Sequence, residues 1–117
     1  MIKSKVFVNC IKDLEDFKNS LLYIEGTDSS SEGYNCAIDC VKDSLCTRID
    51  SLKESMKEYD PQDNIDEKCE CYNEISSMLS VLNADRKDVR GTEFDKSFEE
   101  KIKECIKVLA LLLEKYA

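Results

Sequence analysis

The sequence predicts an all-α protein folded as a single domain, an antiparallel four-helix bundle over residues 1–117. Apolar residues recur every three or four positions through four long segments, which is the period of an amphipathic helix. The 117 residues include only three Gly and one Pro, and strand-like alternation never lasts more than a few positions. Four helices of similar length with short connections form a bundle. A Bcl-2-like arrangement is the alternative, although it normally needs more and shorter helices.

The first two helices are expected over residues 3–25 and 34–59. In the first, the apolar stripe runs from Phe7 to Ile24, and Gly26 ends it because glycine favours the position just past a helix. The Ser-rich residues up to Gly33 favour a loop. In the second helix the spacing continues over eight apolar positions without interruption. These positions are Tyr34, Ile38, Val41, Leu45, Ile49, Leu52, Met56 and Tyr59.

The third and fourth helices are expected over residues 61–83 and 93–116. Pro61 marks the break before the third helix, because proline disfavours helical geometry in the preceding residue and suits a first helical turn. Thr92 and Asp95 resemble a capping box at the start of the fourth helix, whose stripe runs from Phe94 to Tyr116. The third stripe consists of Ile65, Cys69, Tyr72, Ile75, Leu79 and Leu82.

The composition excludes several classes of function. The chain has no His, which removes Ser-His-Asp and Cys-His catalysis and mixed Cys/His zinc sites. It also lacks a Gly-rich phosphate loop, and its carboxylates follow solvated helix faces, so we predict no enzyme activity, no catalytic residue and no cofactor. With 25 Asp and Glu against 17 Lys and Arg, the net charge is -8, which argues against direct nucleic-acid binding.

The distribution of apolar residues predicts a cytoplasmic protein that makes no contact with a membrane. The N-terminal residues lack the apolar core of a signal peptide. The longest other apolar run, from Val108 to Leu113, is far shorter than the roughly 18–20 residues that span a bilayer.

Seven cysteines are present, and their odd number without an export signal predicts reduced thiols that pack as small apolar groups. Cys69 and Cys105 lie on the predicted core stripes. Cys36 and Cys40 share a helix face because they are four residues apart, which would let them hold a thiophilic metal ion together. That five-residue segment resembles the motif of bundles that store Cu(I). We predict no metal site and keep a thiolate bundle for Cu(I) or Zn²⁺ as an alternative.

Acidic residues are concentrated in the predicted third helix, because residues 60–83 hold six acids and one base. Acids in a first helical turn complement the helix macrodipole, but this effect fades beyond that turn. The acidic residues beyond the first turn form either an ordinary solvated face or a surface for a basic partner. The candidate partner-binding acids are Asp63, Asp66, Glu67, Glu70 and Glu74.

Two helices have more apolar residues than a core stripe needs. In an up-down bundle, the start of the first helix, the start of the third and the end of the fourth lie at the same end. We therefore expect an apolar patch at that end, flanked by Val6 and near the acidic residues. Such a patch would be a protein-binding site, because apolar centres with polar rims are typical of these sites. The alternatives are that the fourth helix is simply the most buried one or that the patch closes a homodimer. The candidate apolar contacts are Val8, Val108, Leu111 and Leu113.

These observations predict a small acidic module that works by protein–protein contact. An inhibitor, an immunity protein or antitoxin, or an adaptor fits best, including a phage-encoded inhibitor whose carboxylates partly mimic nucleic-acid charge. The expected partner is another protein with a basic surface. A self-associating structural bundle is the second hypothesis, and the thiolate metal-binding bundle is the third.

Overall fold

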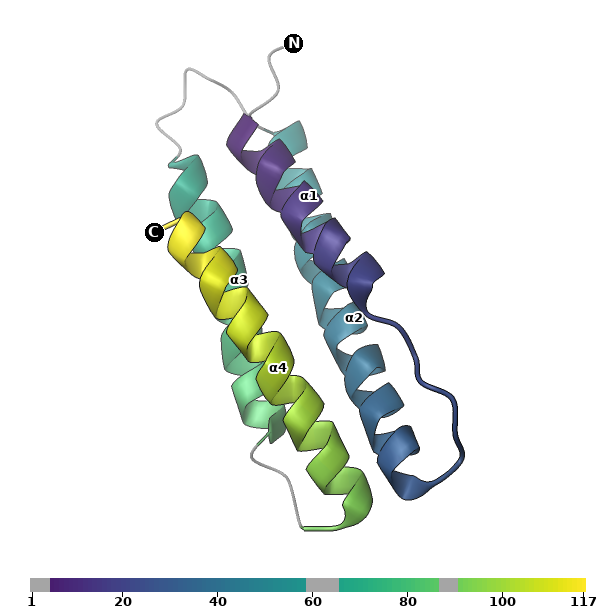
Figure 1. Ribbon diagram of the computed structural model, residues 1–117. Helices are drawn as coiled ribbons and strands as arrows, with labels where there is room; N and C mark the ends of the chain where they lie inside the picture. The colour runs from purple at the N-terminus through teal and green to yellow at the C-terminus, as the bar shows by residue number, and fades with distance from the viewer. Residues whose placement is uncertain (1–4, 59–65, 87–90) are drawn as a thin grey trace.

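The computed structural model describes residues 5–58, 66–86 and 91–117, except for the side chains of residues 85 and 86. In this part of the chain it contains four helices and no strand: α1 (Lys5–Ser20), α2 (Ser29–Lys57), α3 (Glu67–Arg86) and α4 (Glu93–Lys115). Successive helices run in opposite directions along one long axis (Figure 1). The predicted four-helix bundle is therefore confirmed. The predicted helical residues 3–4, 59 and 61–65 lie outside the described residues.

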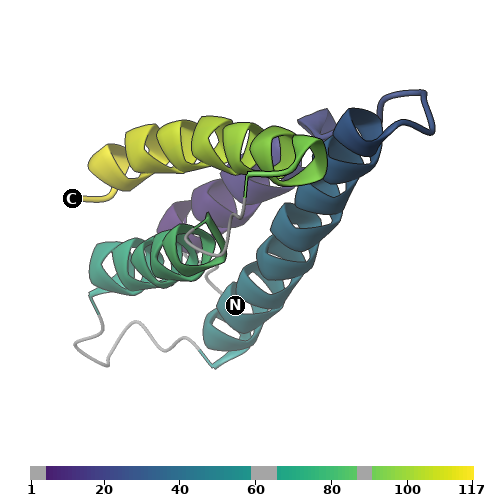
Figure 2. The same ribbon diagram turned by 90° about the horizontal axis from the view of Figure 1, so that it is seen from below.

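The helices pack unequally around the core. α2 packs most extensively on α4, although these two helices run parallel, whereas α1 and α4 share the smallest contact of any helix pair (Figures 1 and 2). Gly33 permits the close approach of α2, because a Cβ built there would lie 2.2 Å from the Phe94 carbonyl oxygen. Nearby, the Ser97 hydroxyl donates a hydrogen bond of 2.6 Å to the Ser30 carbonyl oxygen.

These contacts explain why α2 begins earlier than predicted. Residues 29–33 were expected in a loop, but the helix already starts at Ser29. Asp28 is its N-cap residue with extended backbone geometry, and the Ser31 hydroxyl donates to the Asp28 carboxylate. A serine-rich segment can therefore enter a helix when its hydroxyls find partners, which the composition alone does not reveal.

The first helix ends earlier than its apolar spacing predicts, at Ser20 instead of residue 25. The next residues form a loop that lies against α2. The Asn35 side chain accepts from the Ile24 backbone N–H at 2.9 Å and donates to the Ile24 carbonyl at 3.0 Å. The Tyr23 hydroxyl donates to Asp39, and Gly26 adopts φ = 134°, a conformation that favours glycine. These tertiary bonds replace the helical ones.

The buried face of α3 differs from the predicted stripe at its start. Cys69 is exposed and Tyr72 is 36% exposed, whereas Cys71 is fully buried. The prediction that Cys69 belongs to the core is therefore wrong. The spacing of four, three and four residues still places a helical stripe in the core, but that stripe consists of Cys71, Ile75, Met78 and Leu82.

The fourth helix matches its prediction closely, and Thr92 caps it by accepting a hydrogen bond of 3.1 Å from the Asp95 backbone N–H. Ile102, Cys105 and Leu109 are buried in the core. Within the described residues, no helix is long and apolar enough to cross a membrane.

Candidate functional site

The edge between α1 and α4 is joined by one carboxylate. Asp13 on α1 accepts hydrogen bonds from the Lys115 ammonium at 2.8 Å and from the Tyr116 hydroxyl at 2.7 Å, both at the end of α4. Partial burial alone would raise the pKa of Asp13, but the hydrogen bonds from Lys115 and Tyr116 outweigh it and hold that pKa below its usual value. Asp13 therefore fixes the position of α4 where the two helices otherwise make little contact.

Beyond this contact a small hollow of about 170 Å³ lies between the two helices. Its apolar side is formed by Phe17 of α1 and by Leu21, the first residue after that helix, and Val108 faces them from α4. Lys101 and Glu104 add charged groups to this lining, so the hollow has both apolar and polar walls. We call it the α1–α4 hollow, and its lining residues are Phe17, Ser20, Leu21, Lys101, Glu104, Cys105 and Val108.

Two apolar side chains of α4 are exposed beside this hollow. Leu111 is 69% exposed and Val108 is 40% exposed. With Glu104 and Lys115 they are spaced by four, three and four residues, which places all four side chains along one flank of the helix. We call these four residues the α4 stripe. Leu113 is not part of it, because Leu113 is half-buried and packs against the core.

Val8 is also exposed, but it lies on a different surface. Nine residues separate it from Phe17, which corresponds to opposite sides of a helix at 3.6 residues per turn. Glu15, seven residues after Val8 and thus on the same side, forms an ion pair of 3.2 Å with Lys53 of α2. The apolar residues expected to form one patch therefore divide, with Val8 toward α2 and the α4 stripe beside α1.

Two of the predicted acidic residues, Asp66 and Glu74, have partners within the fold. Asp66 caps α3 by accepting a hydrogen bond of 3.1 Å from the Cys69 backbone N–H. Glu74 is bonded to Arg48 at 3.2 Å and to Ser51 at 2.9 Å, and its side chain is largely buried. Glu67 and Glu70 are half-buried in the first turn of α3. Asp63 lies outside the described residues.

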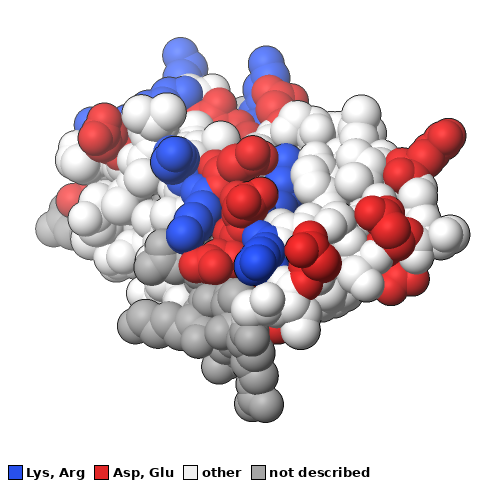
Figure 3. All heavy atoms as spheres, turned by 60° about the horizontal axis from the view of Figure 1, so that its bottom comes forward, with Lys and Arg blue, Asp and Glu red and all other residues white. Residues whose placement is uncertain are grey.

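The charged surface is mixed rather than uniformly acidic. On the face in Figure 3, acidic and basic side chains lie beside one another at the centre, whereas the acidic side chains toward the right edge are surrounded by neutral surface. Among the described residues, further pairs join Glu99 to Lys103 and Glu104 to Lys101, both at 3.2 Å. The net charge of -8 is therefore partly masked locally by neighbouring bases.

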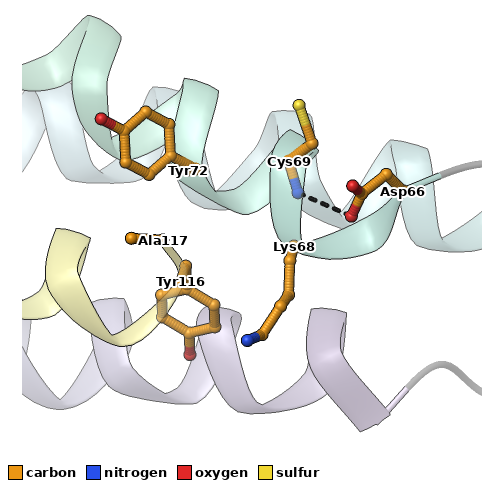
Figure 4. A pocket seen from close by; sticks show the side chains of 6 residues that line it. All are labelled: Asp66, Lys68, Cys69, Tyr72, Tyr116 and Ala117. Atoms are coloured by element: carbon orange, nitrogen blue, oxygen red, sulfur yellow. Dashed lines mark hydrogen bonds between the residues drawn. The ribbon is translucent and has the colours of Figure 1, made fainter.

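A second, larger hollow of about 460 Å³ lies between the start of α3 and the end of α4. Tyr72 of α3 and Tyr116 line it together with Asp66, Lys68 and Cys69 (Figure 4). The sequence did not predict this hollow or the role of Asp13. Asp13 lies on the flank of an apolar stripe and Tyr116 ends another, but helical spacing does not reveal which helix edges meet.

The seven cysteines all lie in the described part of the chain, where they occupy different environments and none is paired in a disulfide. Cys36 and Cys40 are half-buried on α2, and the described residues contain no group of three or more His, Cys, Asp or Glu side chains able to hold a metal ion. Cys105 is buried as predicted, and this burial raises its pKa to about 11. Such a thiol stays protonated near neutral pH and is a poor nucleophile or metal ligand.

The fold and this geometry define a four-helix bundle with an exposed apolar flank on α4. No family model matches the chain, and comparisons with curated proteins and with solved structures also find no match. The functional proposal therefore depends on the geometry of this chain alone.

Proposed function

We propose that this chain is a protein-binding module whose contact surface is the α4 stripe together with the α1–α4 hollow. The observation that carries the proposal is the 69% exposure of Leu111 near the end of a regular helix, with Val108 one turn away. Exposed apolar side chains that share a flank with charged ones resemble the centre and rim of a protein interface. Burying them against a partner would release this apolar surface from water.

The partner class that fits best is another protein with a basic surface, because the chain carries a net charge of -8. An inhibitor, an immunity protein or an adaptor would act through such a contact. A nucleic-acid mimic needs carboxylates without intrachain partners, and Glu74 is bonded to Arg48 and Ser51. The apolar stripe, rather than the acidic start of α3, therefore carries the proposal.

Self-association is the second candidate, and the spacing of the α4 stripe favours it. If two α4 helices pack antiparallel with the twofold axis between residues 109 and 110, Val108 faces Leu111 of the second copy. Glu104 then faces Lys115 of the second copy, so opposite charges flank the apolar contact. Glu104 and Lys115 also have intrachain partners, so this pairing would fix the register more than the affinity.

Photo-cross-linking tests both candidates. A photoreactive amino acid replaces Leu111 in one variant and Val81, an exposed residue of α3, in another, and each is expressed in the source cells. We expect a discrete adduct from position 111 and none from position 81. The adduct mass identifies the occupant, because a second copy adds 13.4 kDa and another protein adds its own mass. Identical adducts from both positions, or none from position 111, would contradict the proposal.

A further inference from the structure

Two cysteines from separate helices meet inside the bundle. Cys10 of α1 and Cys71 of α3 have no exposed surface and belong to the same core cluster. α1 and α3 pack on each other and begin at the same end of the bundle, and each cysteine lies within the first two turns of its helix (Figure 1). The two side chains meet at this level of the core and are hydrogen-bonded to each other. α1 and α3 are not consecutive in the chain, so this contact joins elements that no short loop holds together.

We propose that Cys10 and Cys71 form a redox-active dithiol site, which a low-molecular-weight disulfide oxidises to an intramolecular disulfide between α1 and α3. The site is independent of the proposed binding surface, because neither thiol lines the α1–α4 hollow or belongs to the α4 stripe. Cys105, the other buried cysteine, lines that hollow instead.

The environment gives the two sulfurs different roles. The hydrogen bond from Cys71 lowers the pKa of Cys10, whereas the same bond, together with burial, raises the pKa of Cys71. The thiolate is the form that attacks a disulfide. Cys10 is therefore the attacking sulfur and Cys71 the resolving one, and the reaction proceeds when local opening of the core admits the small disulfide.

The exchange takes two steps. The Cys10 thiolate attacks one sulfur of the small disulfide RSSR, so a bond from Cys10 to RS forms and one RS⁻ leaves and takes up a proton. The Cys71 sulfur then attacks the Cys10 sulfur and its proton passes to the second RS⁻. The products are the Cys10–Cys71 disulfide and two RSH molecules. Counted from the dithiol, the protein loses two electrons and two protons, one of which Cys10 releases to solvent when it ionises, and RSSR gains two electrons and two protons.

The test uses a variant that keeps only the buried cysteines, with Cys36, Cys40, Cys46 and Cys69 changed to Ser. The reduced variant is diluted from denaturant into a buffer of glutathione and glutathione disulfide, equilibrated, alkylated and mapped by mass spectrometry. Circular dichroism verifies the helical fold. We expect the Cys10–Cys71 disulfide to dominate over the two pairings that include Cys105. The cross-linked form should melt about 10 °C above the reduced form, because the bond closes a long loop.

Two outcomes would overturn the proposal. One is a folded protein in which all three thiols remain free at glutathione disulfide concentrations that oxidise the unfolded chain. The other is an equal distribution over the three pairings. The matched control is Cys105→Ser in the same background, which should leave the Cys10–Cys71 disulfide unchanged, whereas Cys71→Ser should remove it.

Discussion

Asp13 is the residue on which the α1–α4 edge depends. Its carboxylate is the common acceptor for Lys115 and Tyr116, and the side chain is 23% exposed, so it is only partly screened by water. The Tyr116 ring is buried, and burial together with the hydrogen bond to Asp13 raises the pKa of its hydroxyl above the usual value. Loss of the carboxylate would leave that hydroxyl without its acceptor, which is costly in a buried position.

We expect Asp13→Ala to lower the free energy of unfolding by about 2 kcal/mol at neutral pH, because a buried hydroxyl loses its charged partner. The pKa of Asp13 is lowered in the folded state, so its contribution is complete above the unfolded pKa of about 3.9 and is lost as pH falls through the folded value. The difference in the free energy of unfolding between the wild type and the variant should therefore become smaller below about pH 4. Urea unfolding at neutral and acidic pH measures both effects.

The control for this prediction is Asp16→Ala on the same helix. Asp16 is exposed, and surface substitutions usually change stability by less than about 0.5 kcal/mol. Two results would show that Asp13 does not fix α4. One is a loss of unfolding free energy in Asp13→Ala that is no larger than the loss in Asp16→Ala, and the other is a loss that stays constant with pH.

At the scale of elements, the parallel pair α2 and α4 is the main packing contact, and Gly33 permits it. A Gly→Ala change inside an ordinary helix stabilises by roughly 0.5–1 kcal/mol. Here the new Cβ would lie 2.2 Å from a backbone oxygen, so one helix must move. We expect Gly33→Ala to destabilise by about 1–3 kcal/mol in urea unfolding, and a stabilised variant would exclude the close contact between α2 and α4.

The sequence predicts helices better than their partners. Apolar spacing found all four helices. The Thr92–Asp95 motif identified the cap of α4, because capping depends only on local residues. Apolar spacing extended α1 to residue 25, because the stripe continues as far as Ile24. In the structure, Asn35 and Tyr23 bind this segment to α2 instead. The spacing predicted that Cys69, rather than Cys71, lies in the core, because both positions fit a helical period. Only the packing of α3 against the other helices decides between the two.

The candidate site illustrates the same limit. Spacing identified Val108 and Leu111 as apolar residues beyond the need of the core, and both are exposed. It grouped Val8 with them because the ends of the helices coincide in an up-down bundle. The rotation of α1 places Val8 on the side of Glu15 and Lys53 instead. Such a rotation depends on contacts among all four helices, which no single stripe contains.

At the scale of the whole molecule, the net charge of -8 and the α4 stripe would have separate roles in binding. Charge spread over a mixed surface accelerates encounter with a basic partner and weakens with salt. The apolar stripe would supply the lasting contact, since the surface removed from water sets most of the affinity at the centre of an interface. The stripe is thus the central claim about function.

The most direct measurement of that claim compares Val108→Glu with Val81→Glu. Both valines are 40% exposed, but Val108 lies on the α4 stripe and Val81 lies on α3. The dissociation constant is measured for the occupant cross-linked at position 111, whether another protein or a second copy. We predict that Val108→Glu weakens binding at least tenfold, about 1.4 kcal/mol, while Val81→Glu leaves it unchanged. Equal dissociation constants for the two folded variants would contradict the account.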